Sequence, residues 1–119
     1  MEIVIPYPKG PIGRFSLNAY YGGKHPAVRR KDAEFWHQMV KAQLYNQKIP
    51  KWIYTKPVKI TFWWNDKLDI DNHAAMAKMI VDALKGWVIE NDSKKYYACC
   101  EHRFHHRPYI IVEVEEWRE

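Results

Sequence analysis

Short apolar segments bounded by turn-forming residues occur at four places along the chain, and each of them predicts a β-strand. In the clearest one, Val58, Ile60 and Phe62 alternate with Lys59 and Thr61, which is the two-residue period of a strand with one buried face. We therefore expect strands over residues 3–7, 57–64, 94–104 and 109–117.

A second pattern, in which apolar residues recur every three or four positions, indicates two helices. One is expected over residues 32–47, with Pro50 just beyond its end, and the other over residues 71–85, with Gly86 placed to end it. Residues 12–30 are rich in Gly, Asn and Tyr, and we expect a long loop or hairpin there.

The expected order of elements is strand, long loop, helix, strand, helix, strand, strand. In a chain of 119 residues this order predicts one α/β domain over residues 1–119. Its core would be a single mixed β-sheet with the two main helices packed on it. The sequence shows no internal repeat, linker or low-complexity tract that would divide the domain.

The chain is basic, with 19 Lys and Arg residues against 14 Asp and Glu and a formal net charge of +5 at pH 7. A basic protein attracts polyanions, so nucleic acid is a candidate partner. We find no secretory signal peptide and no apolar run long enough to span a membrane. The two cysteines, Cys99 and Cys100, are adjacent and are expected to be reduced. These features predict a cytoplasmic protein.

Three aspartates form the most informative polar pattern. Asp69 and Asp71 are two residues apart, and at the end of a strand their side chains would leave the same face. Two carboxylates held close repel each other, and a bound Mg²⁺, which prefers hard oxygen ligands, would remove that conflict. Asp92 follows the second helix, where the chain has room to turn back toward Asp71. Such a set around a cation is common in phosphodiester hydrolysis.

The second predicted helix adds a cation to this pattern. Asp71, Lys78, Asp82 and Lys85 are spaced to share one polar helix face, so Lys78 could meet a phosphate bound at the metal. Two ordinary interpretations stay open. The motif of residues 69–72 is also a good helix N-cap, and Lys78 with Asp82 is also an ordinary exposed ion pair.

These residues resemble the core pattern of the RusA family of Holliday junction resolvases. The resemblance covers most of the chain and is densest over residues 57–92. The matching segments are Asp69-Ile70-Asp71-Asn72, Lys78, Asp82-Ala83-Leu84 and Val88-Ile89-Glu90-Asn91-Asp92, together with Pro57-Val58-Lys59-Ile60 and Ser16-Leu17-Asn18.

The resemblance implies a homodimeric, Mg²⁺-dependent endonuclease, often phage- or prophage-encoded, that nicks four-way DNA junctions symmetrically; Mn²⁺ is expected to substitute. It assigns the metal-binding, catalytic carboxylates to Asp69, Asp71 and Asp92 and the catalytic lysine to Lys78. Asn72 and Asp82 belong to the same motif as supporting residues. One departure is the longer spacing from Asn72 to Lys78, which adds close to one helical turn.

Two basic segments are candidates for DNA contact. Arg29, Arg30 and Lys31 precede the first predicted helix beside Tyr20 and Tyr21, which could stack on unpaired bases. The other segment is the turn His105-His106-Arg107; the alternative for both is a merely solvated surface. A zinc site built from Cys99, Cys100, His102, His105 and His106 is disfavoured, because alternating residues of one strand diverge.

Two other functions stay open at this point. One is a magnesium nuclease for flaps or other branched DNA, because the shape of a junction is read by a whole dimer and not by a motif. The other is a DNA-binding dimer with a decayed active site, against which the presence of all three aspartates argues.

Overall fold

The computed structural model describes residues 1–118 and contains one four-stranded sheet with helices on it. The strands are β1 (Glu2–Pro6), β2 (Val58–Trp64), β3 (Tyr97–Phe104) and β4 (Tyr109–Glu116). The helices are the 3₁₀ turns η1 (Ile12–Phe15) and η2 (Ile70–His73) and the α-helices α1 (Leu17–Tyr21), α2 (Pro26–Asn46) and α3 (Ala74–Leu84). The predicted single α/β domain with a mixed sheet and two main helices is confirmed.

The sheet has the order β1-β4-β2-β3. The central strand β2 pairs antiparallel with β4 and parallel with β3. Since β2 lies between them, β3 and β4 are not neighbours, although only residues 105–108 separate them in sequence. The connection passes the end of β2, where the His105 amide donates to the Trp64 carbonyl oxygen at 2.9 Å.

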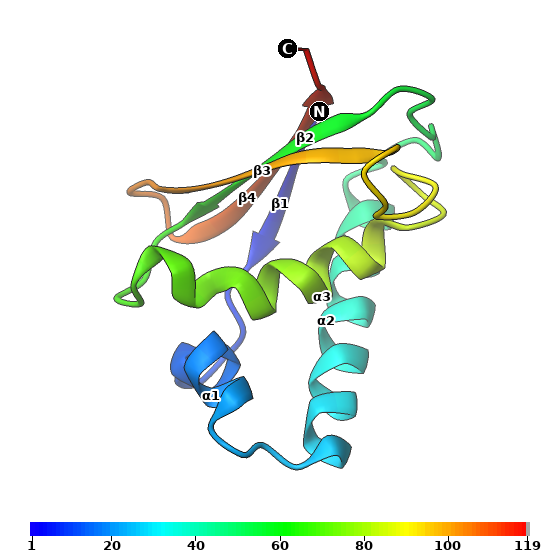
Figure 1. The fold of residues 1–119 in the computed structure, drawn as a ribbon. Coiled ribbons are helices and arrows are strands. Elements are labelled where there is room, and N and C mark those ends of the chain that lie inside the picture. Colours follow the sequence, from blue (N-terminus) through cyan, green and yellow to red (C-terminus); the bar gives the residue numbers. More distant parts are fainter. Residues whose placement is uncertain (119) are drawn as a thin grey trace.

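All three α-helices lie on one side of the sheet (Figure 1). Helix α3 runs under the strands, and α2 crosses α3 (Figure 1). The covered face of β2 presents Val58, Ile60, Phe62 and Trp64, each completely buried. Each such side chain contributes about 1.5–3 kcal/mol of transfer free energy. This core holds α3 against the sheet and thereby fixes the segments before and after it.

The interpretation of residues 12–30 as a long loop or hairpin is wrong. The Ser16 hydroxyl accepts from the Ala19 amide at 3.1 Å and starts α1, and His25 caps α2, whose first residue is Pro26. Proline suits the first turn of a helix, where its missing N–H costs nothing, so α2 begins six residues before the predicted start at Asp32. The glycines and tyrosines around Pro26 hid that signal.

Two other predicted boundaries also shift. The expected helix over residues 71–85 is η2 followed by α3, and Gly86, with a φ of 76°, lies just past its end as predicted. The third strand begins at Tyr97 rather than Lys94, because residues 93–97 form a turn in which the Tyr96 and Tyr97 amides donate to the Ser93 carbonyl.

Candidate active site

Asp69 and Asp71 lie in the segment between β2 and α3, several residues after the chain has left the sheet. Strand β2 ends at Trp64, so the prediction that both aspartates stand at a strand end is wrong. Asp69 is the N-cap of η2 and Asp71 belongs to its first turn, and both residues are exposed. The sequence predicted that Asp71 and Lys78 lie on one regular helix. This is wrong, because Asp71 precedes α3.

A buried histidine holds this loop in place. His73 is completely buried, and its ring stacks on the indole of Trp64 with centroids 4.5 Å apart. Its Nδ1 lies 3.1 Å from the Ile70 carbonyl oxygen, and its Nε2 lies 2.8 Å from Oδ1 of Asp66. The two ring nitrogens thus contact the loop backbone on one side and the Asp66 carboxylate on the other. The turn that bears Asp71 is therefore tied to the sheet.

Asp66 connects the same loop to β1. The Tyr7 hydroxyl donates to Oδ2 of Asp66 at 2.8 Å and accepts from the Asn65 amide at 2.7 Å. The Leu68 amide donates to Oδ1 of Asp66 at 3.0 Å. Burial of the Tyr7 hydroxyl raises its pKa well above the ordinary value. We call Tyr7, Asp66 and His73 the buried network.

Asn72 links the loop to α1. Its Oδ1 accepts from the backbone amide of Asn18 at 3.0 Å, in the first turn of that helix. The last residue of the Asp69–Asn72 motif thus sets where α1 lies relative to the two aspartates. This contact gives Asn72 a structural role and places Tyr20 and Tyr21 near the candidate site.

The lysine of the motif lies in a group of four charges at the end of α3. Lys78 Nζ is 2.8 Å from Oδ1 of Asp82 and 2.8 Å from Oδ2 of Asp92. Lys85 Nζ completes the group at 3.0 Å from Asp82 and 3.3 Å from Asp92. We call these residues the lysine–aspartate cluster. It confirms that Lys78 and Asp82 share one helix face. Asp92, which was expected to turn back toward Asp71, meets Lys78 and Lys85.

The electrostatics of the lysine–aspartate cluster keep its members charged. Hydrogen bonds to Asp82 and then Asp92 raise the pKa of Lys78 above its ordinary value. The hydrogen bond from Lys78 holds the pKa of Asp92 below its ordinary value. At Asp82 burial works against ionisation, but the hydrogen bonds from both lysines outweigh it and the pKa is lowered. All three groups are therefore ionised at neutral pH.

The aspartates match Mg²⁺ in ligand chemistry, because carboxylate oxygens are the hard donors that this ion takes. Within residues 1–118, however, no group of three or more His, Cys, Asp or Glu side chains lies close enough to hold a metal ion. Asp92 is turned toward Lys78 and Lys85 instead. The donor set fits the cation, but the closed set of three carboxylates expected from the sequence is not formed here.

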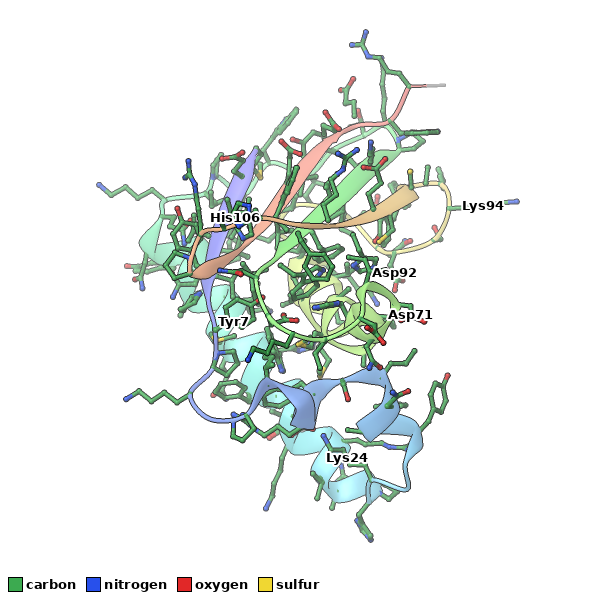
Figure 2. The ribbon with its side chains drawn as sticks, turned by 90° about the vertical axis from the view of Figure 1, so that its left-hand side faces the viewer. Tyr7, Lys24, Asp71, Asp92, Lys94 and His106 are labelled. Carbon is green, nitrogen blue, oxygen red and sulfur yellow. The ribbon has the colours of Figure 1, made fainter. Side chains whose placement is uncertain are left out.

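The candidate DNA-binding residues are not gathered at this site. Arg29, Arg30 and Lys31 lie inside α2 rather than ahead of it, and the Arg29 guanidinium sits 4.1 Å from the ring centre of Tyr20. Figure 2 shows Asp71 and Asp92 on one flank of the molecule and His106 away from that flank. His106 belongs to the turn after β3, at the opposite end of that strand from the Asp92 loop.

Several residues near the site were missed in the sequence. Lys94 is exposed and projects from the flank that bears Asp92 (Figure 2), in the loop directly after that residue. Tyr7 and Asp66 form contacts that depend on the folded chain, and neither has a regular spacing to the motif. His73 lies in the segment that makes the spacing from Asn72 to Lys78 longer than in the family pattern. That longer spacing was the one signal in the sequence that pointed to His73.

No helix among the described residues has the length and apolar character needed to cross a membrane. A search of curated proteins finds no match to the chain. The family described as Endodeoxyribonuclease RusA matches residues 8–115, which is nearly all of the chain and includes every residue of the motif. The chain therefore belongs to the RusA family and is an endodeoxyribonuclease of the crossover-junction class.

Proposed function

We propose that this protein is a Mg²⁺-dependent resolvase that cuts four-way DNA junctions by paired, symmetric nicks. The observation that carries the proposal is the family match combined with the position of Lys78, which contacts Asp92 and lies on the helix that follows Asp71. Asp69, Asp71 and Asp92 would hold the cation, with Mn²⁺ as a substitute. When bound, the cation supplies a Lewis acid and an activated water.

The protein's own residues would position and stabilise the reacting phosphate. Lys78 is 60% exposed at its side chain and keeps its positive charge, so it can reach a phosphate and offset the charge that develops there. Asp82 and Lys85 orient Lys78 and Asp92 through the contacts of the lysine–aspartate cluster. The buried network and Asn72 keep the Asp69–Asp71 turn in place.

The DNA contacts would come from the basic surface around this site. Lys94 lies closest along the chain to Asp92, and Arg30 and Lys31 are exposed on α2. His105, His106 and Arg107 would reach DNA farther from the cut. With a net charge of +5 per chain, binding should weaken as salt rises, because each neutralised phosphate releases counterions.

We also propose that the protein acts as a homodimer, since a two-fold enzyme matches a two-fold substrate and places one site on each strand to be cut. Large apolar side chains that stay exposed in the single chain support this, among them Tyr45 and Trp52, at 77% and 53%. Sedimentation should give twice the mass of the 14.3 kDa chain. A monomer both alone and on DNA would contradict the dimer.

The direct test of the proposed function is cleavage of a synthetic four-way junction beside linear, flapped and nicked duplexes, in Mg²⁺ and in EDTA. We expect paired nicks in the junction alone and only with the metal. Full cleavage in EDTA would exclude the metal mechanism, and equal cleavage of flaps would favour a general branched-DNA nuclease. Lys78→Ala should slow cleavage by about 10²-fold or more, whereas Lys41→Ala, an exposed lysine on α2, should not.

A further inference from the structure

A hollow of about 260 Å³ opens between α3 and β3 beside Lys78 and Asp92. Small or apolar side chains of α3 form one wall, and side chains of β3 form the other. The α3 wall consists of Ala74, Ala77 and Val81, and the β3 wall of Tyr97, Cys100 and His102. None of the β3 residues belongs to the motif that carries the proposed chemistry, so the hollow is a feature beyond it.

The polar groups on the β3 wall are neutral. The Trp64 indole N–H donates to Nδ1 of His102 at 3.0 Å, which places the His102 proton on Nε2, 3.6 Å from the Cys100 sulfur. Burial lowers the pKa of His102 and raises the pKa of the Tyr97 hydroxyl and of the Cys100 thiol. The wall thus offers hydrogen-bond donors and acceptors without a net charge.

The uncharged walls formed by α3 and β3 do not suit a phosphate, which Lys78, a charged residue that also lines the hollow, would bind instead. It suits a flat, neutral ring with polar edges. The volume lies just below the range of about 300–1,000 Å³ typical of small-ligand pockets, as expected for one ring rather than a whole nucleotide. In DNA such a ring is joined to its phosphate through a single sugar.

We propose that this hollow receives one unstacked nucleobase of the DNA, next to the phosphate bound at Lys78. The inference rests on the proposed function and names how the same site selects its substrate. Inside a continuous duplex, a base must lose its pairing and stacking before it can enter such a pocket. At a branch point those interactions are already interrupted, so entry is easier. The hollow would therefore favour cleavage at branched DNA over linear duplex.

The test combines pocket-filling variants with DNA that lacks one base. Four-way junctions are prepared in which each nucleotide around the mapped cut is replaced in turn by an abasic one. Cleavage in Mg²⁺ and binding in Ca²⁺ are measured for the wild type and for Ala74→Leu, which fills the hollow from an exposed position on α3. Cys100→Leu fills it from the opposite wall, and Ala42→Leu, exposed on α2, is the matched control.

For the wild type and the control, one abasic position should lower cleavage on the order of 10-fold. Both filled variants should already show that loss on the intact junction and lose nothing more at the same abasic position, with binding in Ca²⁺ changed far less. If the abasic change lowers cleavage equally in filled and unfilled proteins, or affects none of them, the hollow does not take a base. If the wild type cuts no junction at all, the proposed function fails and this inference with it.

Discussion

The buried network and the lysine–aspartate cluster place aspartates beside histidine or lysine side chains in opposite surroundings. In the buried network, the side chains of His73 and Asp66 are 0% and 6% exposed. In the lysine–aspartate cluster, Lys78 and Asp92 are 60% and 32% exposed at the side chain. Asp66 and His73 belong to the segment between β2 and α3, whereas Lys78 and Asp82 lie on α3.

The difference indicates a division of roles. A buried pair that loses one partner leaves a polar group without water, so the buried network should hold one geometry. An exposed pair is screened and contributes little to stability, so its members can exchange partners at low cost. The Asp71 turn is thus held in one position, while Lys78 and Asp92 can exchange partners, as the proposed binding of a phosphate and a cation requires.

The largest effect on stability should come from His73→Ala. This change leaves the Asp66 carboxylate with only the Tyr7 hydroxyl and the Leu68 amide as partners and removes the stacking on Trp64, so the free energy of unfolding should fall by about 3–5 kcal/mol. Urea unfolding measures it. His106→Ala, at an exposed histidine, is the control and should stay near the wild type. An equal, small loss in both would show that the buried network does not fix the loop.

A smaller loss is expected for Tyr7→Phe. The hydroxyl accepts from the Asn65 amide and donates to Asp66, and removing it should lower the free energy of unfolding by about 1–2 kcal/mol. Tyr21→Phe removes a hydroxyl from a side chain that is 76% exposed and should change little. The same value for both substitutions would speak against a stabilising role of the Tyr7 contacts.

The smallest effect on stability is expected in the lysine–aspartate cluster. Asp82→Asn removes a partner of Lys78 and Lys85, and the free energy of unfolding should change by no more than about 1 kcal/mol. Junction cleavage should nevertheless drop, because Lys78 is held less firmly. A loss of stability as large as that of His73→Ala would remove the contrast between the two groups.

The sequence predicted the parts of this molecule that depend on local periodicity. The strands, the existence of α2 and α3, and the shared face of Lys78 and Asp82 follow from spacing within one element. The early start of α2 was missed because Pro26 was interpreted as a loop residue, although the first turn of a helix tolerates proline.

Other features depend on contacts between distant segments and could not be predicted in this way. Tyr7 meets Asp66 across 59 positions of the chain, and His102 meets Trp64 across 38. The position of Asp69 and Asp71 was predicted from an expected strand end, but β2 stops earlier and η2 carries the turn. The motif therefore provided the candidate residues of the site, and the tertiary contacts decide how they lie.

The proposed role of Asp71 in cleavage is tested most directly by Asp71→Asn, with junction cleavage measured in Mg²⁺ and junction binding in Ca²⁺. Asn keeps the size of the side chain, and at this exposed position the fold should survive. Cleavage should be abolished, because a metal-ligand charge is lost, while binding stays equal or tightens as repulsion of DNA phosphates falls. Glu34→Gln, exposed on α2, removes the same charge away from the site and should cut normally. Cleavage by Asp71→Asn at the wild-type rate would contradict the assignment of this site.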